Sequence, residues 1–191
     1  DVAPADLLRP IEPDHRLEQD RNAFDDPPAG YDPRALKGMG LAYATSDRGA
    51  CHLRATFYKP ELAGMIPPEQ IEGKAELFLE FEDRLTIFDT LVLCRFYRDF
   101  YLWEPLEEII HAVTGLKAGE AALREKAKEV ATLIRRFNLR EGMQPEDERL
   151  TKALHRPLTD TGKVITEEEL EIMLKDYYRL HGWDETGQPI S

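Results

Sequence analysis

Residues 48–54 bring one thiol, one imidazole and two guanidinium groups together within seven positions. Cys51 and His52 are adjacent, and the nearby Gly49 lets the backbone approach a ligand closely. The pair could be metal ligands, a nucleophile with its base, or packed residues. Direct neighbours diverge on a helix or strand, so a catalytic dyad between them is geometrically poor. Residue types alone favour packing. His52 is the candidate for chemistry, because an imidazole exchanges protons near neutral pH.

A second candidate site is residues 89–94, where Asp89 and Cys94 enclose an apolar run. A carboxylate in such surroundings needs hydrogen-bond donors, either backbone N–H groups or a nitrogen-rich ligand. Composition alone favours Cys94 as a core thiol beside Leu93. The aromatic residues that follow are also expected in the core: Tyr97, Phe100, Tyr101 and Trp103. A zinc site made of Cys51, His52 and Cys94 ranks low, because no fourth ligand lies at a familiar spacing.

Composition and charge exclude several classes of function. The chain has 191 residues and a formal net charge of −12, which argues against sequence-independent binding of nucleic acid. No apolar run approaches the roughly 20 residues needed to span a bilayer, and no secretory signal pattern is present. The two cysteines form no disulfide framework, which favours a cytoplasmic location. The chain starts at Asp1, from which we expect a fragment or a processed product.

Proline content divides the chain into two parts. Residues 1–30 carry five prolines and no apolar period, so we expect an extended arm or linker there and a helical domain over residues 31–191. Asp32 and Pro33 predict the start of a helix that runs to about Tyr43. Gly38 and Gly40 weaken this helix, or allow close approach of another segment. Residues 60–68 read as a loop.

Apolar residues at steps of three and four predict the remaining helices. The stripes are Phe78, Phe81, Leu85 and Phe88; Leu106, Ile109, Ile110 and Val113; Leu123, Ala127, Val130, Ile134 and Phe137; and Leu170, Met173, Leu174, Tyr177 and Tyr178. The last stripe follows a capping box at residues 166–169. With no convincing strand alternation, the fold class is all-α: an irregular multi-helix domain with an extended proline-rich N-terminal arm.

Residues 37–55 resemble the C-terminal region of tungsten-containing aldehyde:ferredoxin oxidoreductases. Further matches follow in the right order at residues 89–94, 137–142 and 177–184. The resemblance covers about residues 31–189, and the length of the first motif makes it specific.

The resemblance implies that aldehydes are oxidised to carboxylic acids at tungsten, sometimes molybdenum, held by two pterin dithiolenes. Electrons then leave through a 4Fe-4S cluster to ferredoxin. Residues 89–94 resemble the second pterin-contacting loop of the family. On that match Asp89 hydrogen-bonds the pterin, Leu93 lines the site and Cys94 is one of four cluster ligands. His52 resembles the histidine placed close to the metal and the substrate, where it stabilises or protonates a developing oxyanion.

Two departures from the family pattern matter. Val92 replaces the usual glycine of the pterin loop, and a β-branched residue tolerates positive φ poorly. The other three cluster cysteines and the β-rich cofactor base would lie upstream of residue 1. We therefore expect the N-terminal portion of the same protein, ferredoxin and an aldehyde as partners. We expect the chain alone to hold neither tungstopterin (or molybdopterin) nor the cluster, and to be inactive. The alternative is a non-catalytic helical interaction module that has lost the cofactors.

Overall fold

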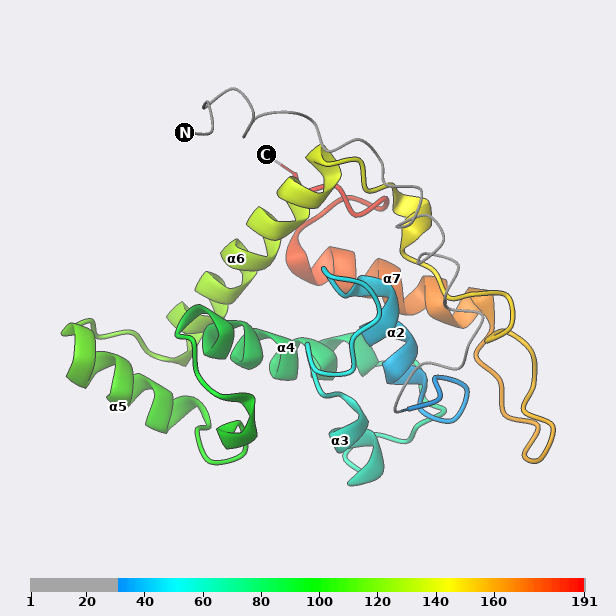
Figure 1. Ribbon diagram of the computed structural model, residues 1–191, viewed down its shortest axis with the longest axis horizontal. Coiled ribbons are helices and arrows are strands. Elements are labelled where there is room, and N and C mark those ends of the chain that lie inside the picture. Colours follow the sequence, from blue (N-terminus) through cyan, green and yellow to red (C-terminus); the bar gives the residue numbers. More distant parts are fainter. Residues whose placement is uncertain (1–30, 191) are drawn as a thin grey trace, which may run out of the picture.

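The computed structural model describes residues 31–190, which fold into helices joined by loops (Figure 1). The elements are α2 (Lys37–Thr45), α3 (Tyr58–Leu62), α4 (Lys74–Thr90), η3 (Arg95–Tyr97), α5 (Trp103–Thr114), α6 (Glu120–Arg140), η4 (Pro145–Asp147) and α7 (Glu167–His181). Within this range the β-structure is limited to two isolated bridges. The all-α prediction is confirmed. The predicted arm at residues 1–30 lies outside the described residues.

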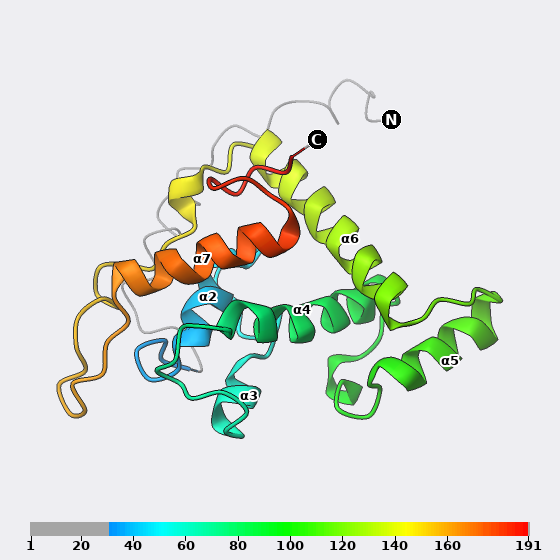
Figure 2. The same cartoon turned by 180° about the vertical axis from the view of Figure 1, so that it is seen from behind.

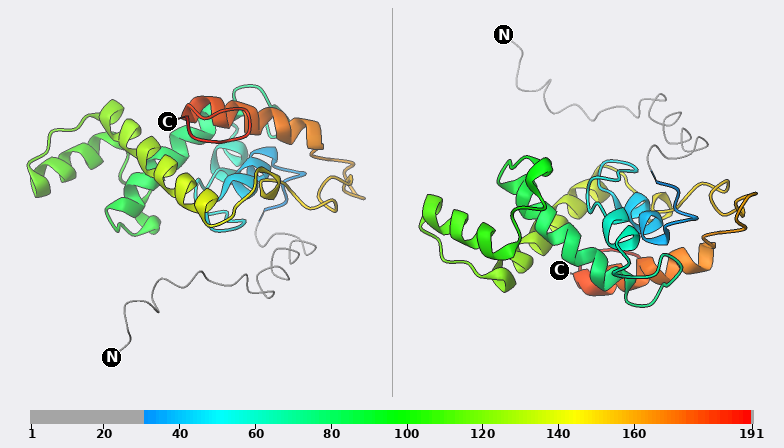
Figure 3. Two further views of the ribbon diagram at one scale, coloured as in Figure 1. Left: turned by 90° about the horizontal axis from the view of Figure 1, so that it is seen from above. Right: turned by 90° about the horizontal axis from the view of Figure 1, so that it is seen from below.

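Helix α4 occupies the centre of the fold and packs against α2, α6 and α7 (Figures 1 and 2). Its predicted stripe explains this position, because Phe78, Leu85 and Phe88 are buried and Phe81 packs at the edge of the main core. Helix α5 lies at one end of the long axis, and α6 runs back from it toward the C-terminal residues (Figures 1 and 3). The main core therefore forms where α2, α4 and α7 meet.

The predicted stripes of α5 and α6 are correct only where the two helices face α4. Leu106, Ile110, Leu123 and Ala127 are buried. Val113 is 79% exposed near the outer end of α5. Phe137 is 53% exposed, because that part of α6 turns Arg135 rather than Phe137 toward the rings of Tyr178 and Trp183. Placing these two apolar residues in the core was wrong.

Arg135 is buried near the C-terminal end of α6, with its guanidinium over the rings of Tyr178 and Trp183. Its guanidinium forms an ion pair of 2.5 Å with Glu148, and its Nε donates to the carbonyl oxygen of Gly187 at 2.9 Å. Tyr178 on α7 donates its hydroxyl proton to the same Glu148 carboxylate. This polar contact joins α6, the segment after η4 and the C-terminal residues.

Helix α2 begins at Lys37 rather than at Pro33. Asp32 instead accepts the N–H of Arg34 on its side chain at 2.9 Å, which forms a turn before the helix. The two glycines serve close approach: a Cβ at Gly38 would lie 2.2 Å from a ring carbon of Phe57, and one at Gly40 would lie 2.5 Å from Ile165. Both glycines therefore allow the main core to close around α2.

A buried ion pair joins α3 to α4. Lys74 and Glu61 are 0% exposed at their side chains and lie 2.5 Å apart, and Gly38 donates its N–H to the same carboxylate at 2.9 Å. Burial raises the pKa of Glu61 and lowers that of Lys74, which is the cost of holding two charges away from water. The predicted loop at residues 60–68 is wrong over its first residues, because α3 ends at Leu62.

Helix α7 begins at the predicted capping box. Thr166 accepts the N–H of Glu169 at 3.1 Å, and Glu169 accepts the N–H of Thr166 at 2.9 Å. Gly182 ends the helix in the left-handed conformation, with φ of 73°. These contacts confirm the boundaries predicted from the sequence.

Asp83 on α4 makes the stability of the fold pH-dependent. Burial, followed by the charge of Glu82, raises the pKa of Asp83 to about 7, although Arg124 lies 3.8 Å away. The folded pKa lies above the unfolded value of about 3.9. The stabilising contribution of the protonated form is therefore complete at low pH and is lost as the pH rises toward 7.

The unfolding free energy of the wild type is expected to decrease between pH 5 and pH 8. We expect Asp83→Asn to make this decrease smaller by about 2 kcal/mol. Urea unfolding at the two pH values measures this difference. The exposed Asp160→Asn serves as the control and should keep the wild-type dependence. Equal pH dependence in wild type and Asp83→Asn would contradict the expectation.

Candidate functional site

The two sequence motifs meet at the carboxylate of Asp89. Arg95 binds it at two points, with its Nε donating to Oδ1 at 3.0 Å and its Nη2 to Oδ2. Arg54 donates to the same Oδ2 from Nη1. The carboxylate has donors, as expected, but they are two guanidinium groups rather than the backbone N–H groups or the ligand that were expected. Residues 48–54 and 89–94 are thereby held side by side.

Arg54 extends this contact toward α6. Its Nη2 lies 3.1 Å from Oδ2 of Asp47, so the guanidinium bridges Asp47 and Asp89. Asn138 on α6 donates its side-chain N–H to the carbonyl oxygen of Asp47 at 3.1 Å. The third matching segment, residues 137–142, thus reaches the first motif directly.

The Cys51 thiol lies against positive charge. Its sulfur accepts from Nη2 of Arg48 at 3.2 Å and from the N–H of Leu53 at 3.4 Å. Burial raises the pKa of this thiol, but these donors outweigh it, and the pKa of Cys51 lies below its usual value. Cys51 is therefore a half-buried free thiol whose thiolate form is favoured by Arg48.

His52 is half-buried at the surface of the same loop. Its ring lies 6.1 Å from the ring of Tyr31, which stacks on Tyr58 at 3.9 Å. Within residues 31–190 the imidazole nitrogens of His52 make no hydrogen bond or ion pair, so they are available to a ligand.

The loop after α4 keeps a left-handed residue at the position of the family glycine. Val92 has φ of 57° and is 90% exposed. The turn is closed by the N–H of Leu93, which donates to the carbonyl oxygen of Phe88 at 2.9 Å. Val92 thus keeps the left-handed backbone conformation that glycine favours, at a cost in strain.

Leu93 and Cys94 are neighbours in the loop but lie in different surroundings. Leu93 packs against the small cluster of Leu85, Phe88 and Leu106, whereas Cys94 is exposed. The composition-based placement of Cys94 in the core is wrong, because the turn ends at this residue and η3 begins after it. Among the described residues, no three His, Cys, Asp or Glu side chains lie where they could share a metal ion, which gives the zinc alternative no support.

The aromatic residues after Cys94 are divided between core and surface. Tyr101 and Trp103 pack at the edge of the small cluster. Phe96, Tyr97 and Phe100 are 86%, 55% and 73% exposed, so the expected core placement is wrong for Tyr97 and Phe100. The segment from Val92 to Leu102 therefore presents a set of exposed apolar side chains around Cys94.

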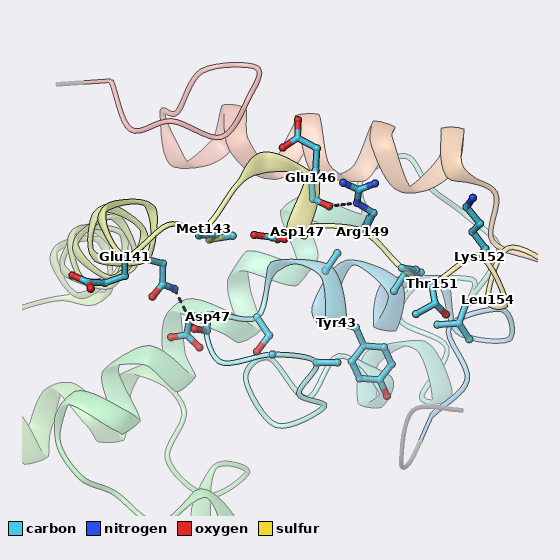
Figure 4. A pocket seen from close by; sticks show the side chains of 16 residues that line it. Tyr43, Asp47, Glu141, Met143, Glu146, Asp147, Arg149, Thr151, Lys152 and Leu154 are labelled. Atoms are coloured by element: carbon cyan, nitrogen blue, oxygen red, sulfur yellow. Dashed lines mark hydrogen bonds between the residues drawn. The ribbon is translucent and has the colours of Figure 1, made fainter. Parts of the chain in front are cut away.

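A pocket of about 730 Å³ lies between the end of α2 and the segment that follows α6 (Figure 4). Tyr43 and Asp47 line one side, and Met143 and Arg149 line the other. The volume suits a small molecule. Sequence reasoning missed this pocket, because residues 141–154 carry no periodic signal. Small residues such as Gly49, which lines it, were the only indication.

Comparisons with known proteins show the family to which the chain belongs. A model of the family described as aldehyde ferredoxin oxidoreductase, domains 2 and 3, matches residues 26–191. The tungsten-containing aldehyde ferredoxin oxidoreductases of Thermococcus kodakarensis, Pyrococcus abyssi and Pyrococcus furiosus are similar at 31%, 30% and 30% identity. Each match covers 83% of this chain and 27% of the relative, so the chain spans about a quarter of their length. No helix within residues 31–190 is both long and apolar enough to span a membrane.

We expect Val92→Gly to stabilise the chain by about 0.5–1 kcal/mol, because relief of the left-handed strain outweighs the added chain entropy of glycine. Urea unfolding measures the change. Val113→Gly, an exposed valine within α5, is the control and should destabilise the chain. Destabilisation by Val92→Gly would show that the backbone at Val92 is not strained.

Arg48→Met is expected to slow alkylation of Cys51 at pH 7 by about threefold or more, because the thiolate loses its cationic partner. The rate with iodoacetamide is measured in a Cys94→Ser background. Arg156→Met, an exposed arginine elsewhere, should leave the rate unchanged. An unchanged rate in Arg48→Met would show that Arg48 does not activate the thiol.

Proposed function

We propose, because the chain belongs to the aldehyde ferredoxin oxidoreductase family, that it forms the C-terminal part of an enzyme that oxidises aldehydes to carboxylic acids. The observation that carries this proposal is the double contact of Asp89 with Arg54 and Arg95. It brings the His52 loop beside the loop that ends at Cys94. The N-terminal portion of the same protein would complete the site, and the enzyme would work in the cytoplasm.

The residues of this chain fit a pterin and an iron–sulfur cluster as contributors to a shared site. Cys94 is an exposed thiol, as a cluster ligand must be before the cluster is enclosed. A 4Fe-4S cluster takes four cysteines, so three would come from elsewhere. Asp89 is 37% exposed at its side chain and can still accept a hydrogen bond from a pterin N–H. When bound, the tungsten or molybdenum pterin would supply the two-electron oxidation, and the cluster would pass electrons to ferredoxin.

His52 would handle the proton at this site. Conversion of an aldehyde and water to a carboxylic acid releases two protons with two electrons. The half-buried imidazole can accept one of these protons or donate to a developing oxyanion. The stacked rings of Tyr31 and Tyr58 limit the space in which the imidazole can move.

The large pocket offers a place for the aldehyde. Gly49 and Ala50 line it, and the chain then continues directly to Cys51 and His52. We therefore place the substrate in this pocket, with its carbonyl toward the His52 loop. The exposed apolar side chains between Val92 and Leu102 would contact the N-terminal portion of the protein, because they surround the cysteine that shares the cluster.

Full-length protein purified without oxygen is expected to contain tungsten or molybdenum together with iron, and to reduce ferredoxin with an aldehyde. Metal analysis and an activity assay test this. Absence of these metals supports the alternative, a non-catalytic helical interaction module. The retained left-handed conformation at Val92 weakens the argument for that alternative.

The isolated 191-residue chain is expected to form no stoichiometric 4Fe-4S cluster, because it contains only two cysteines. Anaerobic reconstitution with iron and sulfide, followed by absorption spectroscopy, tests this. A spectrum of one cubane cluster per chain would contradict it.

A further inference from the structure

Arg95 occupies the junction between the two loops of the candidate site. It follows Cys94 directly and begins η3. Two of its nitrogens hold Asp89, as described above. The third, Nη1, donates to the carbonyl oxygen of Leu53 and lies 3.3 Å from that of Arg54. One side chain thus contacts the end of α4 and the backbone next to His52.

The contacts leave Asp89 with one defined position for a further donor. A carboxylate offers about four lone-pair sites. Arg95 and Arg54 both donate to Oδ2, and Arg95 alone donates to Oδ1. The side chains of Arg54 and Arg95 are 12% and 16% exposed, whereas that of Asp89 is 37% exposed. The free acceptor site therefore belongs to Oδ1.

We infer that Arg95 is a positioning residue: it orients Oδ1 of Asp89 toward the pterin and fixes the distance between the His52 loop and Cys94. The inference rests on the proposed function. The planar guanidinium is required because it forms parallel bonds to a carboxylate and a further bond in another direction. The single ammonium of lysine cannot reproduce that geometry, although it keeps the charge.

The first experiment tests the contact itself, without cofactors. Asp89→Asn, Arg95→Lys and the double variant of the 191-residue chain are compared by urea unfolding. We expect the change in unfolding free energy of the double variant to differ from the sum of the two single changes. The difference should correspond to about fivefold in the unfolding equilibrium constant. Additive changes in unfolding free energy would show that the side chains of Asp89 and Arg95 do not interact.

The second experiment measures pterin and tungsten or molybdenum per polypeptide in full-length Arg95→Lys, on the monodisperse fraction from gel filtration. We expect occupancy to fall about tenfold or more, as for other residues that orient a ligand. Occupancy should also fall in Arg54→Lys, which is the second variant. Arg136→Lys, an exposed arginine on α6 outside the segments that match the family, is the matched control and should keep full occupancy.

The outcomes separate the two levels of the proposal. Wild-type protein without pterin would overturn the proposed function and the positioning role with it. Wild-type protein with pterin, together with full occupancy in Arg95→Lys, would overturn only the positioning role. Loss of pterin in Arg95→Lys with retention in Arg136→Lys supports both.

Discussion

The carboxylate of Asp89, held between Arg54 and Arg95, is the contact on which the arrangement of the site depends. It lies in the last turn of α4, the helix around which the fold is built. Charges in these positions are costly to remove from water unless they are paired, and here each carboxylate oxygen meets at least one guanidinium. Arg95 also donates to the carbonyl oxygen of Leu53, so one side chain ties the end of α4 to the His52 loop.

A second paired charge secures the opposite end of the same helix. Lys74 begins α4 and is fully buried against Glu61, which also accepts the N–H of Gly38. Helix α4 is therefore held at one end to α2 and α3 and at the other end to the loop that follows α2. Its apolar stripe fills the space between, so the two loops of the site are positioned by a rigid element.

Features set by local sequence could be predicted. The capping box at Thr166 and the apolar stripe of α4 depend on neighbours three and four positions away, and both are present. The exposure of Phe137 could not be predicted, because its helix has the right period but meets the core near its end through Arg135. Which face of α6 is covered there depends on where Tyr178 and Trp183 pack, which periodicity within α6 does not encode.

The candidate site was predictable only in part, because some of its contacts join residues far apart in the sequence. Motif resemblance identified His52, Asp89, Leu93 and Cys94, and the structure brings their two loops together. The contacts of Arg95 were missed, since its partners lie six and 42 positions away and no local pattern links them. Cys94 lies in an apolar run, so composition placed it in the core.

The central claim is that Cys94 and Asp89 face a shared cofactor site in the full-length protein. A crystal structure of that protein, grown without oxygen and measured at the iron absorption edge, tests this most directly. The account predicts an iron–sulfur cluster bonded to the sulfur of Cys94, with Asp89 between Arg54 and Arg95 and its Oδ1 bonded to the pterin. A cluster bonded to other residues, with Cys94 in contact only with solvent, would contradict it.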